Sequence, residues 1–93
     1  MKPGKTDYQY QVISRIKQLR IAHNYSQVKL AEYLCISNGL VGNIESLRFR
    51  HKYTLYQISR VAQLFGVSIP FLFLGEECDD INTILNKIIE YDR

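Results

Sequence analysis

The chain has 93 residues, of which 46% are hydrophobic and 23% are charged, with 5 glycines and 2 prolines. This length holds one small domain, and the composition excludes collagenous and low-complexity disordered chains. No apolar run approaches the roughly 20 residues of a membrane-spanning helix, and the N-terminus has no apolar signal-peptide core. The two cysteines have neither CxxC nor zinc-ligand spacing. We therefore expect a soluble cytoplasmic protein with no metal or other cofactor.

Charge divides the chain into two unequal parts. Residues 1–75 carry ten Lys and Arg against three acidic residues, a net charge of +7. Residues 76–93 carry two basic residues against six acidic ones, a net charge of −4. This division predicts that residues 1–75 bind a polyanion and that residues 76–93 are repelled by it. A solvated surface with uneven charge is the alternative that charge alone leaves open.

The pattern of the first half predicts three helices. Thr6-Asp7-Tyr8-Gln9 has the form of a capping box, which begins the first helix. Ser26 and Ser37 are suitable N-caps for two short helices, over 27–34 and over 38 to about 46. The residues expected to face the core recur at helical spacing. They are Val12, Ile13, Ile16, Leu19 and Arg20 in the first helix, Leu30, Ala31 and Leu34 in the second, and Val41 and Ile44 in the third.

A basic and aromatic loop over residues 47–53 precedes the next two helices. Thr54-Leu55-Tyr56-Gln57 is a second capping box, and Gly66 is suited to end the helix that follows. Ser68-Ile69-Pro70 then begins a short fifth helix, because proline is tolerated in the first turn. The expected inward residues are Leu55, Ile58, Val61, Ala62 and Phe65 in the fourth helix, and Phe71, Leu72 and Phe73 in the fifth.

A last helix is predicted over about residues 79–91, after an acidic hinge. Its apolar stripe contains Ile81, Ile84, Leu85, Ile88 and Ile89. The stripe must be covered, either by the chain's own domain or by a second copy of the chain. Since no strand pattern or internal repeat is present, the chain is predicted to be all-α. We expect a flexible segment over 1–6, a five-helix domain over 7–75, and the acidic hinge with a C-terminal amphipathic helix over 76–93.

The most informative segment runs from Ser26 to Glu45 and contains two short helices joined by a tight turn. The segment reads Ser26-Gln27-x-x-Leu30-Ala31-Glu32-x-Leu34-x-Ile36-Ser37-x-x-x-Val41-x-x-Ile44-Glu45. This pattern is similar to the helix-turn-helix of the lambda-repressor-like Cro/Xre proteins. The likeness continues as Leu55-x-x-Ile58-x-x-Val61-Ala62-x-x-Phe65-Gly66-Val67-Ser68. It covers about Ile13 to Leu74. The resemblance implies a five-helix DNA-binding domain whose third helix enters the major groove of double-stranded DNA.

The resemblance also implies roles for residues outside the third helix's outer face. Gln27 matches a residue at the start of the second helix that binds a DNA phosphate. Arg20 and Glu45 match a structural ion pair between the first and third helices. The helical pattern supports this pair independently, because Arg20 lies on the inward stripe, Glu45 follows an inward isoleucine, and buried charges must be paired.

The third helix predicts the base contacts. At about 100° per residue, its outer face carries Gly39 and Asn43. We expect base contacts from Asn38, Gly39, Leu40 and Asn43, since asparagine can bond adenine and leucine can meet a thymine methyl. The face is nevertheless poor in the Arg, Lys and Gln that usually read bases. Gly39 and Gly42 leave three alternatives open. They allow the helix backbone to come close to a groove or a partner, they indicate that the helix reads bases only weakly, or they reflect neutral drift.

The loop after the third helix departs from the family pattern. Leu47 stands where a glycine is usual, and the loop is about two residues longer. Its basic side chains are expected to bind phosphates beside the groove, while Phe49 and Tyr53 anchor the loop to the core. A solvated basic loop is the alternative. The phosphate-binding candidates of this loop are Arg48, Arg50 and Lys52.

These patterns favour a sequence-preferring DNA-binding protein, a repressor-like transcriptional regulator that acts as a homodimer. Family members bind two half-sites through a two-fold dimer, which favours dimerisation by the last helix. The alternative is an antitoxin or interaction module with weak base reading, whose acidic C-terminal segment meets a protein partner. An enzyme is not expected, because His23 and His51 have no reactive partner at triad spacing. The dimer candidates are Ile81, Ile84, Leu85 and Ile88.

Overall fold

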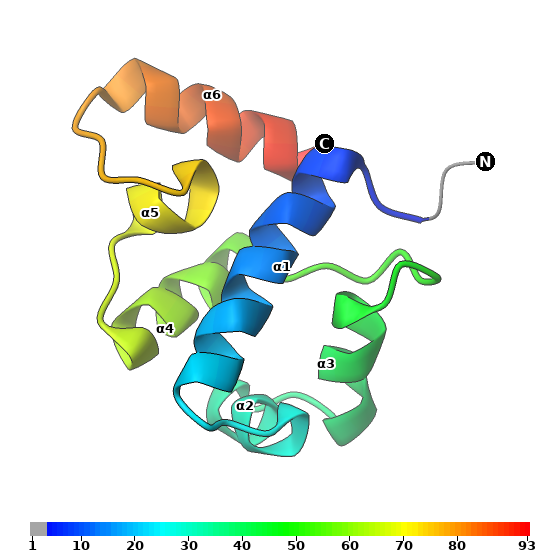
Figure 1. Cartoon of the computed structure of the whole chain (residues 1–93). Helices are drawn as coiled ribbons and strands as arrows, with labels where there is room; N and C mark the ends of the chain where they lie inside the picture. Colours follow the sequence, from blue (N-terminus) through cyan, green and yellow to red (C-terminus); the bar gives the residue numbers. More distant parts are fainter. Residues whose placement is uncertain (1–3) are drawn as a thin grey trace.

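The computed structural model describes residues 4–93, and these residues form six α-helices with no strand (Figure 1). The predicted all-α class, five helices followed by a C-terminal helix, is confirmed. No helix in this part of the chain has the length and apolarity needed to cross a membrane. The helices are α1 (Asp7–Ala22), α2 (Gln27–Leu34), α3 (Asn38–Glu45), α4 (Leu55–Phe65), α5 (Ile69–Leu74) and α6 (Ile81–Asp92).

Local capping explains where most of these helices begin and end. Both predicted capping boxes are formed, at Thr6 before α1 and at Thr54 before α4. Gly66 ends α4 in the left-handed conformation with φ of 68°, which costs glycine little. Ser37 has the backbone conformation of an N-cap before α3, but its side chain makes no cap bond. Side-chain caps also begin α2, α5 and α6, from Ser26, Ser68 and Asp80.

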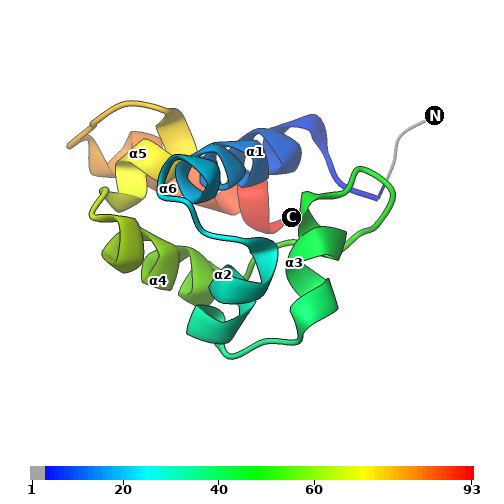
Figure 2. The ribbon, with the colours of Figure 1, turned by 60° about the horizontal axis from the view of Figure 1, so that its bottom comes forward.

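Helix α1 crosses the middle of the molecule and the other helices pack around it. α3, α5 and α6 contact α1, α2 packs on α3, and α5 also contacts α4. In Figure 1, α6 lies beside the N-terminal end of α1, whereas α2 lies near its C-terminal end, and Figure 2 shows α6 behind α1 and α5. All six helices contribute to the core. The buried hydrophobic residues are Val12, Ile13, Ile16, Leu30, Ala31, Val41, Ile44, Tyr53, Ile58, Val61, Ala62, Phe65, Leu72, Phe73 and Tyr91.

Several sequence expectations are wrong in detail. Leu55 is 39% exposed, because it is the first residue of α4 and the buried stripe of that helix begins one turn later. Phe49 is exposed rather than anchored in the core, so Tyr53 alone fulfils the predicted aromatic anchoring. Helix α6 begins at Ile81 because Asp80 is its N-cap, and α3 ends at Glu45, one residue early, because Ser46 is extended.

Helix α6 folds back on its own domain through its last turn. Tyr91 is completely buried, and its hydroxyl donates a hydrogen bond to the Tyr53 carbonyl oxygen at 2.7 Å. The Gln9 side chain, which also completes the α1 capping box, donates to the Tyr91 carbonyl oxygen at 2.8 Å. The Tyr91 ring packs edge-on against Phe73. The sequence stripe did not include Tyr91, although this residue attaches the helix.

The predicted stripe of α6 is divided between two environments. Ile84 and Ile88 are half-buried, and Ile88 packs against the core. Ile81, Leu85 and Ile89 remain 64%, 48% and 58% exposed. One edge of the stripe therefore covers the chain's own domain, which was the first alternative, and the other edge faces outward. Pairing of that outer edge with a second copy of the chain stays a prediction. We call Ile81, Leu85 and Ile89 the outer row of α6.

Candidate nucleic-acid interface

The outer face of α3 is open in the part of the chain that the structure describes. Val41 and Ile44 are buried against the domain, so the opposite side of this short helix turns outward. Asn38 and Gly39 are exposed. A Cβ atom built on Gly39 would meet nothing within 4 Å, and α6 packs on α1 and α5 instead. A bare α-helix of this kind fits the major groove of DNA.

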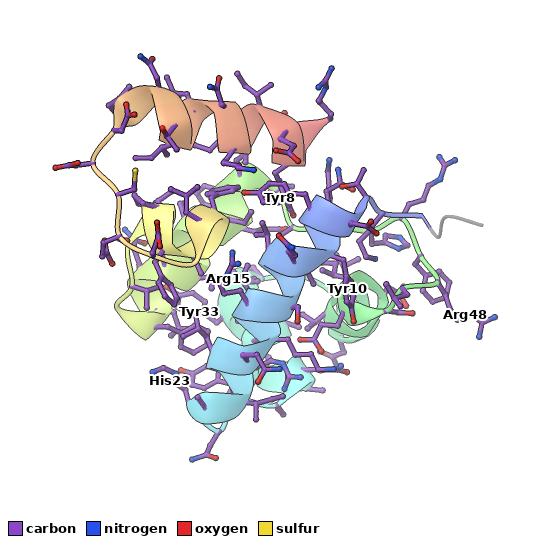
Figure 3. All side chains as sticks on the ribbon, turned by 45° about the horizontal axis from the view of Figure 1, so that its top comes forward. Tyr8, Tyr10, Arg15, His23, Tyr33 and Arg48 are labelled. Atoms are coloured by element: carbon purple, nitrogen blue, oxygen red, sulfur yellow. The ribbon has the colours of Figure 1, made fainter. Side chains whose placement is uncertain are left out.

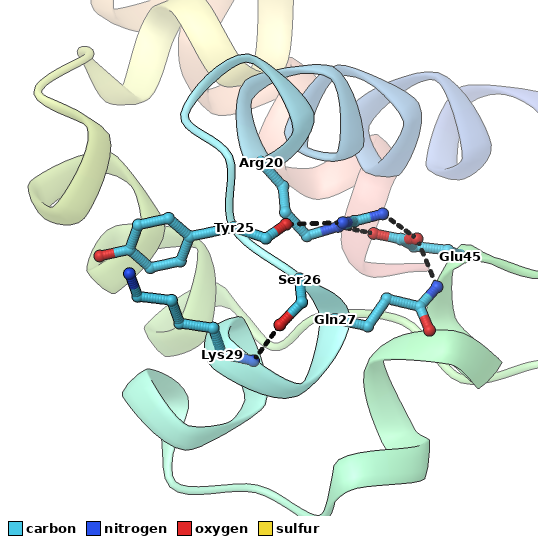
Figure 4. Close-up of polar contacts among 6 residues, drawn as sticks. All are labelled: Arg20, Tyr25, Ser26, Gln27, Lys29 and Glu45. Atoms are coloured by element: carbon cyan, nitrogen blue, oxygen red, sulfur yellow. Dashed lines mark hydrogen bonds and ion pairs between the residues drawn. The ribbon is translucent and has the colours of Figure 1, made fainter.

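The predicted ion pair holds α3 to α1 from the inner side. Arg20 and Glu45 are only 8% and 6% exposed. The Arg20 Nε and Nη2 atoms donate to the two Glu45 carboxylate oxygens at 2.8 and 3.0 Å, in the bidentate geometry of strong pairs. Arg20 Nη1 donates to the Tyr25 carbonyl oxygen at 2.8 Å (Figure 4). The network fixes the start of α2 and the end of α3 to the same point of α1.

Gln27 joins this network and explains one of the two glycines in α3. Its Nε2 atom donates to Glu45 Oε1 at 2.9 Å (Figure 4). To reach the carboxylate, the Gln27 side chain passes close to Gly42, where an added Cβ would lie 3.3 Å from Gln27 Oε1. A side chain at Gly42 would therefore lie in close contact with the Gln27 amide, whereas Gly39 faces open space. Gln27 is exposed, so its predicted phosphate contact remains a prediction.

The basic loop after α3 presents two of its three predicted phosphate ligands to solvent. Arg48 and Arg50 are exposed, and Figure 3 shows Arg48 pointing away from the body. Lys52 differs, because its Nζ atom donates to the Tyr91 carbonyl oxygen at 3.0 Å and lies 5.3 Å from the centre of the Tyr91 ring. This bond holds the Lys52 ammonium at the end of α6, and a phosphate contact would have to compete with it.

Tyr53 anchors the end of the loop, as predicted. It is completely buried, and burial raises the pKa of its phenol above the ordinary value, with the nearby Glu45 carboxylate as a second cause. Its hydroxyl has no hydrogen-bond partner among the described residues. Because the Tyr53 carbonyl accepts the Tyr91 hydroxyl, the loop end and α6 are fixed together.

Comparison with known families agrees with this geometry. A family model described as helix-turn-helix matches residues 16–72, which is more than half of the chain. The chain belongs to the lambda-repressor-like Cro/Xre helix-turn-helix family. In this Cro/Xre domain, α2 and α3 are the DNA-binding helix-turn-helix, and the family is not an enzyme family. Neither the curated proteins nor the solved structures gave a match.

Lys5 is the residue of this Cro/Xre domain that sequence reasoning missed. It lies in the segment expected to be flexible, of which residues 1–3 fall outside the described residues. Lys5 is nevertheless only 2% exposed and donates hydrogen bonds to the basic loop. A single lysine just before a capping box gives no sequence signal for such a contact, since lysine is usually exposed.

Proposed function

We propose that this protein is a transcriptional regulator that reads a preferred duplex sequence with α3 and acts as a homodimer in the cytoplasm. The observation that carries the proposal is the open outer face of α3 on a body with a net charge of +7 over residues 1–75. The base contacts are assigned to Asn38, Gly39, Leu40 and Asn43. The bare backbone at Gly39 lets the helix approach the base edges closely.

Phosphate contacts flank this face in the proposal. Gln27 stands at the start of α2, where backbone N–H groups also point toward an anion. Arg48 and Arg50 stand on the exposed loop after α3. Since phosphate contacts position a protein and base contacts specify the sequence, these residues set the register in which Asn38 and Asn43 meet the bases.

The outer row of α6 supports the homodimer. Ile81, Leu85 and Ile89 are spaced by four residues, which places them on one ridge of the helix. Antiparallel pairing of two α6 helices about a two-fold axis at Leu85 would set Ile81 of one copy opposite Ile89 of the other. Such pairing leaves the outer face of α3 free, because α6 packs on α1 and α5 and lies apart from α3 (Figure 1).

Selection from a random duplex library tests this function. We expect the enriched sequences to share a motif with two-fold symmetry, since each half-site meets one copy of α3. The affinity for the selected duplex should fall about 10³-fold or more between 50 and 200 mM salt if the dimer neutralises six or more phosphates. An affinity independent of salt, or a selection without any shared motif, would contradict the proposal.

A protein-interaction module, such as an antitoxin, is the second candidate. It is favoured by the scarcity of base-reading side chains on α3 and by the exposed acidic residues of the hinge. In this reading the acidic segment meets a protein partner. A partner that co-purifies in stoichiometric amount, together with no binding to any member of the duplex library, would support it over the regulator. The exposed acidic residues are Glu76, Glu77, Asp79 and Asp80.

A further inference from the structure

The residues just before α1 lie against the basic loop. Thr6 is the N-cap of α1, so the direction in which the preceding residues leave the helix is fixed. At Gly4, an added Cβ atom would lie 2.7 Å from both the Cα and the backbone nitrogen of Arg50. Contacts this short do not occur in folded proteins. The approach of the two backbones therefore requires glycine at this position.

Next to Gly4, the Lys5 side chain is buried with its charged end among backbone carbonyls. Its Nζ atom donates to the carbonyl oxygens of Phe49 at 2.6 Å, of His51 at 3.0 Å and of Asn43 at 3.4 Å. A lysine ammonium has three N–H donors, so each has an acceptor here. Burial lowers the pKa of Lys5 below its ordinary value, and the three carbonyls compensate part of this lost hydration.

The three acceptors belong to two different elements. Asn43 lies in the last turn of α3, where a positive charge is favourable, and its carbonyl oxygen also accepts the Ser46 amide at 3.3 Å. Phe49 and His51 lie in the basic loop. One side chain at the start of α1 therefore joins the end of the DNA-reading helix to the loop that follows it.

Between the end of α3 and Arg50, the basic loop has few contacts with the domain other than those of Lys5. Leu47 and Phe49 are 50% and 42% exposed, and residues 46–54 contain no helix. Arg48 makes a local bond from its amide to the Ser46 hydroxyl. After Arg50, the loop is next attached to the domain at Lys52, whose ammonium donates to the Tyr91 carbonyl oxygen, and at Tyr53, whose ring is buried. The place of Arg48 and Arg50 relative to α3 therefore depends on the contact with Lys5.

We infer that Lys5 is a positioning residue for DNA binding: its buried ammonium holds the loop so that Arg48 and Arg50 meet phosphates at a fixed distance from α3. The inference rests on the proposed function and adds a residue to it. Lys5 is too buried to contact DNA itself. Its contribution is preorganisation, because a loop already held in place loses less conformational freedom on binding.

A comparison of two lysine variants tests the inference. Lys5→Met removes the ammonium and keeps a stem of similar length, and Lys17→Met removes an equal charge elsewhere, on α1. Arg50→Ala is then added to each variant and to the unaltered protein. In the unaltered protein and in Lys17→Met, we expect Arg50→Ala to reduce the slope of log affinity against log salt by about 0.9 per chain. In Lys5→Met the same change should reduce the slope by less than half as much.

Gly4→Ala provides a second test in which every charge is kept. Its Cβ displaces the Arg50 backbone, so we expect a several-fold loss of duplex affinity and faster amide exchange at residues 48–51 in the absence of DNA. Thermal unfolding of each variant verifies that it is folded at the temperature used. If Lys5→Met does not fold, Gly4→Ala carries the test.

The outcomes separate the two claims. Equal effects of Arg50→Ala in all three backgrounds, or unchanged affinity and exchange in Gly4→Ala, would overturn the role of Lys5 and leave the proposed function intact. If the unaltered protein itself showed no salt-dependent duplex binding, the proposed function would fail, and the role of Lys5 in DNA binding would fail with it.

Discussion

Helices α3 and α6 both leave one side uncovered, but the two open faces differ in chemistry. The open face of α3 carries the exposed Asn38 and Gly39 and the half-buried Asn43, which are small or polar. The outer row of α6 consists of Ile81, Leu85 and Ile89, which are 64%, 48% and 58% exposed. A face without bulk that can donate and accept hydrogen bonds suits base edges, whereas an exposed aliphatic ridge suits a second apolar helix.

The two helices are also attached to the domain in different ways. Helix α3 is held by a buried ion pair and by apolar contacts of Val41 and Ile44. Helix α6 is held at its last turn by the buried Tyr91, and its exposed row runs from the first turn to the last on the outer side. The comparison shows that α3 is held to α1 by a buried polar network, while α6 keeps an aliphatic row exposed along its outer side.

The largest expected effect comes from the support of α3. Arg20→Met would leave the Glu45 carboxylate buried without its cation, which costs about 3–5 kcal/mol of unfolding free energy. Urea denaturation measures this loss. Arg48→Met, at an exposed position, serves as the control for losing an arginine and should change the stability far less. A similar loss in both variants would show that the buried pair does not fix α3.

The next effect concerns the outer row of α6. Leu85→Glu places a charge at the centre of the proposed dimer contact and removes an apolar contribution of about 1.5–3 kcal/mol for each leucine. We expect the mass measured by analytical ultracentrifugation to change from dimer to monomer, with an unchanged helix content. Asn86→Glu adds the same charge one residue further along the exposed surface and should leave the dimer intact. A monomeric unaltered protein would contradict this assignment of the row.

On the face of α3, Asn43→Ala should relax the base preference at one position by about 1–3 kcal/mol. Arg50→Ala should weaken binding to all duplexes alike, because phosphate contacts carry no sequence information. Affinities for the selected duplex and for single-base variants of it measure both changes. Uniform losses in both proteins would remove Asn43 from the base-reading residues.

The smallest effect tests how α6 is attached. Tyr91→Phe keeps the buried ring and removes the hydroxyl that donates to the Tyr53 carbonyl oxygen, which should cost about 1–2 kcal/mol of unfolding free energy. Tyr10→Phe, on a half-buried ring of α1, is the matched control. Amide exchange should rise first in α6 for Tyr91→Phe, and an increase spread evenly over all helices would be inconsistent with a local attachment.

The sequence predicted most of the fold because its signals are local. The capping boxes at Thr6 and Thr54 and the stop at Gly66 each depend on a few neighbouring residues, and they were found correctly. The contacts of Lys5, Lys52 and Tyr91 were missed, since they join residues 38 or more positions apart. Apolar periodicity could not reveal them, because the deciding groups are an ammonium, a phenol and backbone carbonyls.

The same limit applied to the candidate site. The partnership of Arg20 and Glu45 followed from the family pattern and from the inward positions of both residues. The sequence did not predict that Gln27 bonds to Glu45 and that the Gln27 side chain lies close to Gly42. Spacing along a helix does not show which neighbouring group a flexible amide side chain will bond. The sequence thus left the two glycines of α3 equivalent, and only the three-dimensional arrangement separates them.

The single amide of Gln9 has a consequence for folding. Its oxygen accepts from the Thr6 amide at the first helix cap, and its nitrogen reaches Tyr91, 82 positions further along the chain. This one side chain therefore connects the two ends of the chain, and closing so long a loop has an entropic cost that grows with its length. In the unaltered protein, where both this bond and the Tyr91 hydroxyl bond are present, we therefore expect the C-terminal helix to melt together with the rest of the domain in one cooperative thermal transition.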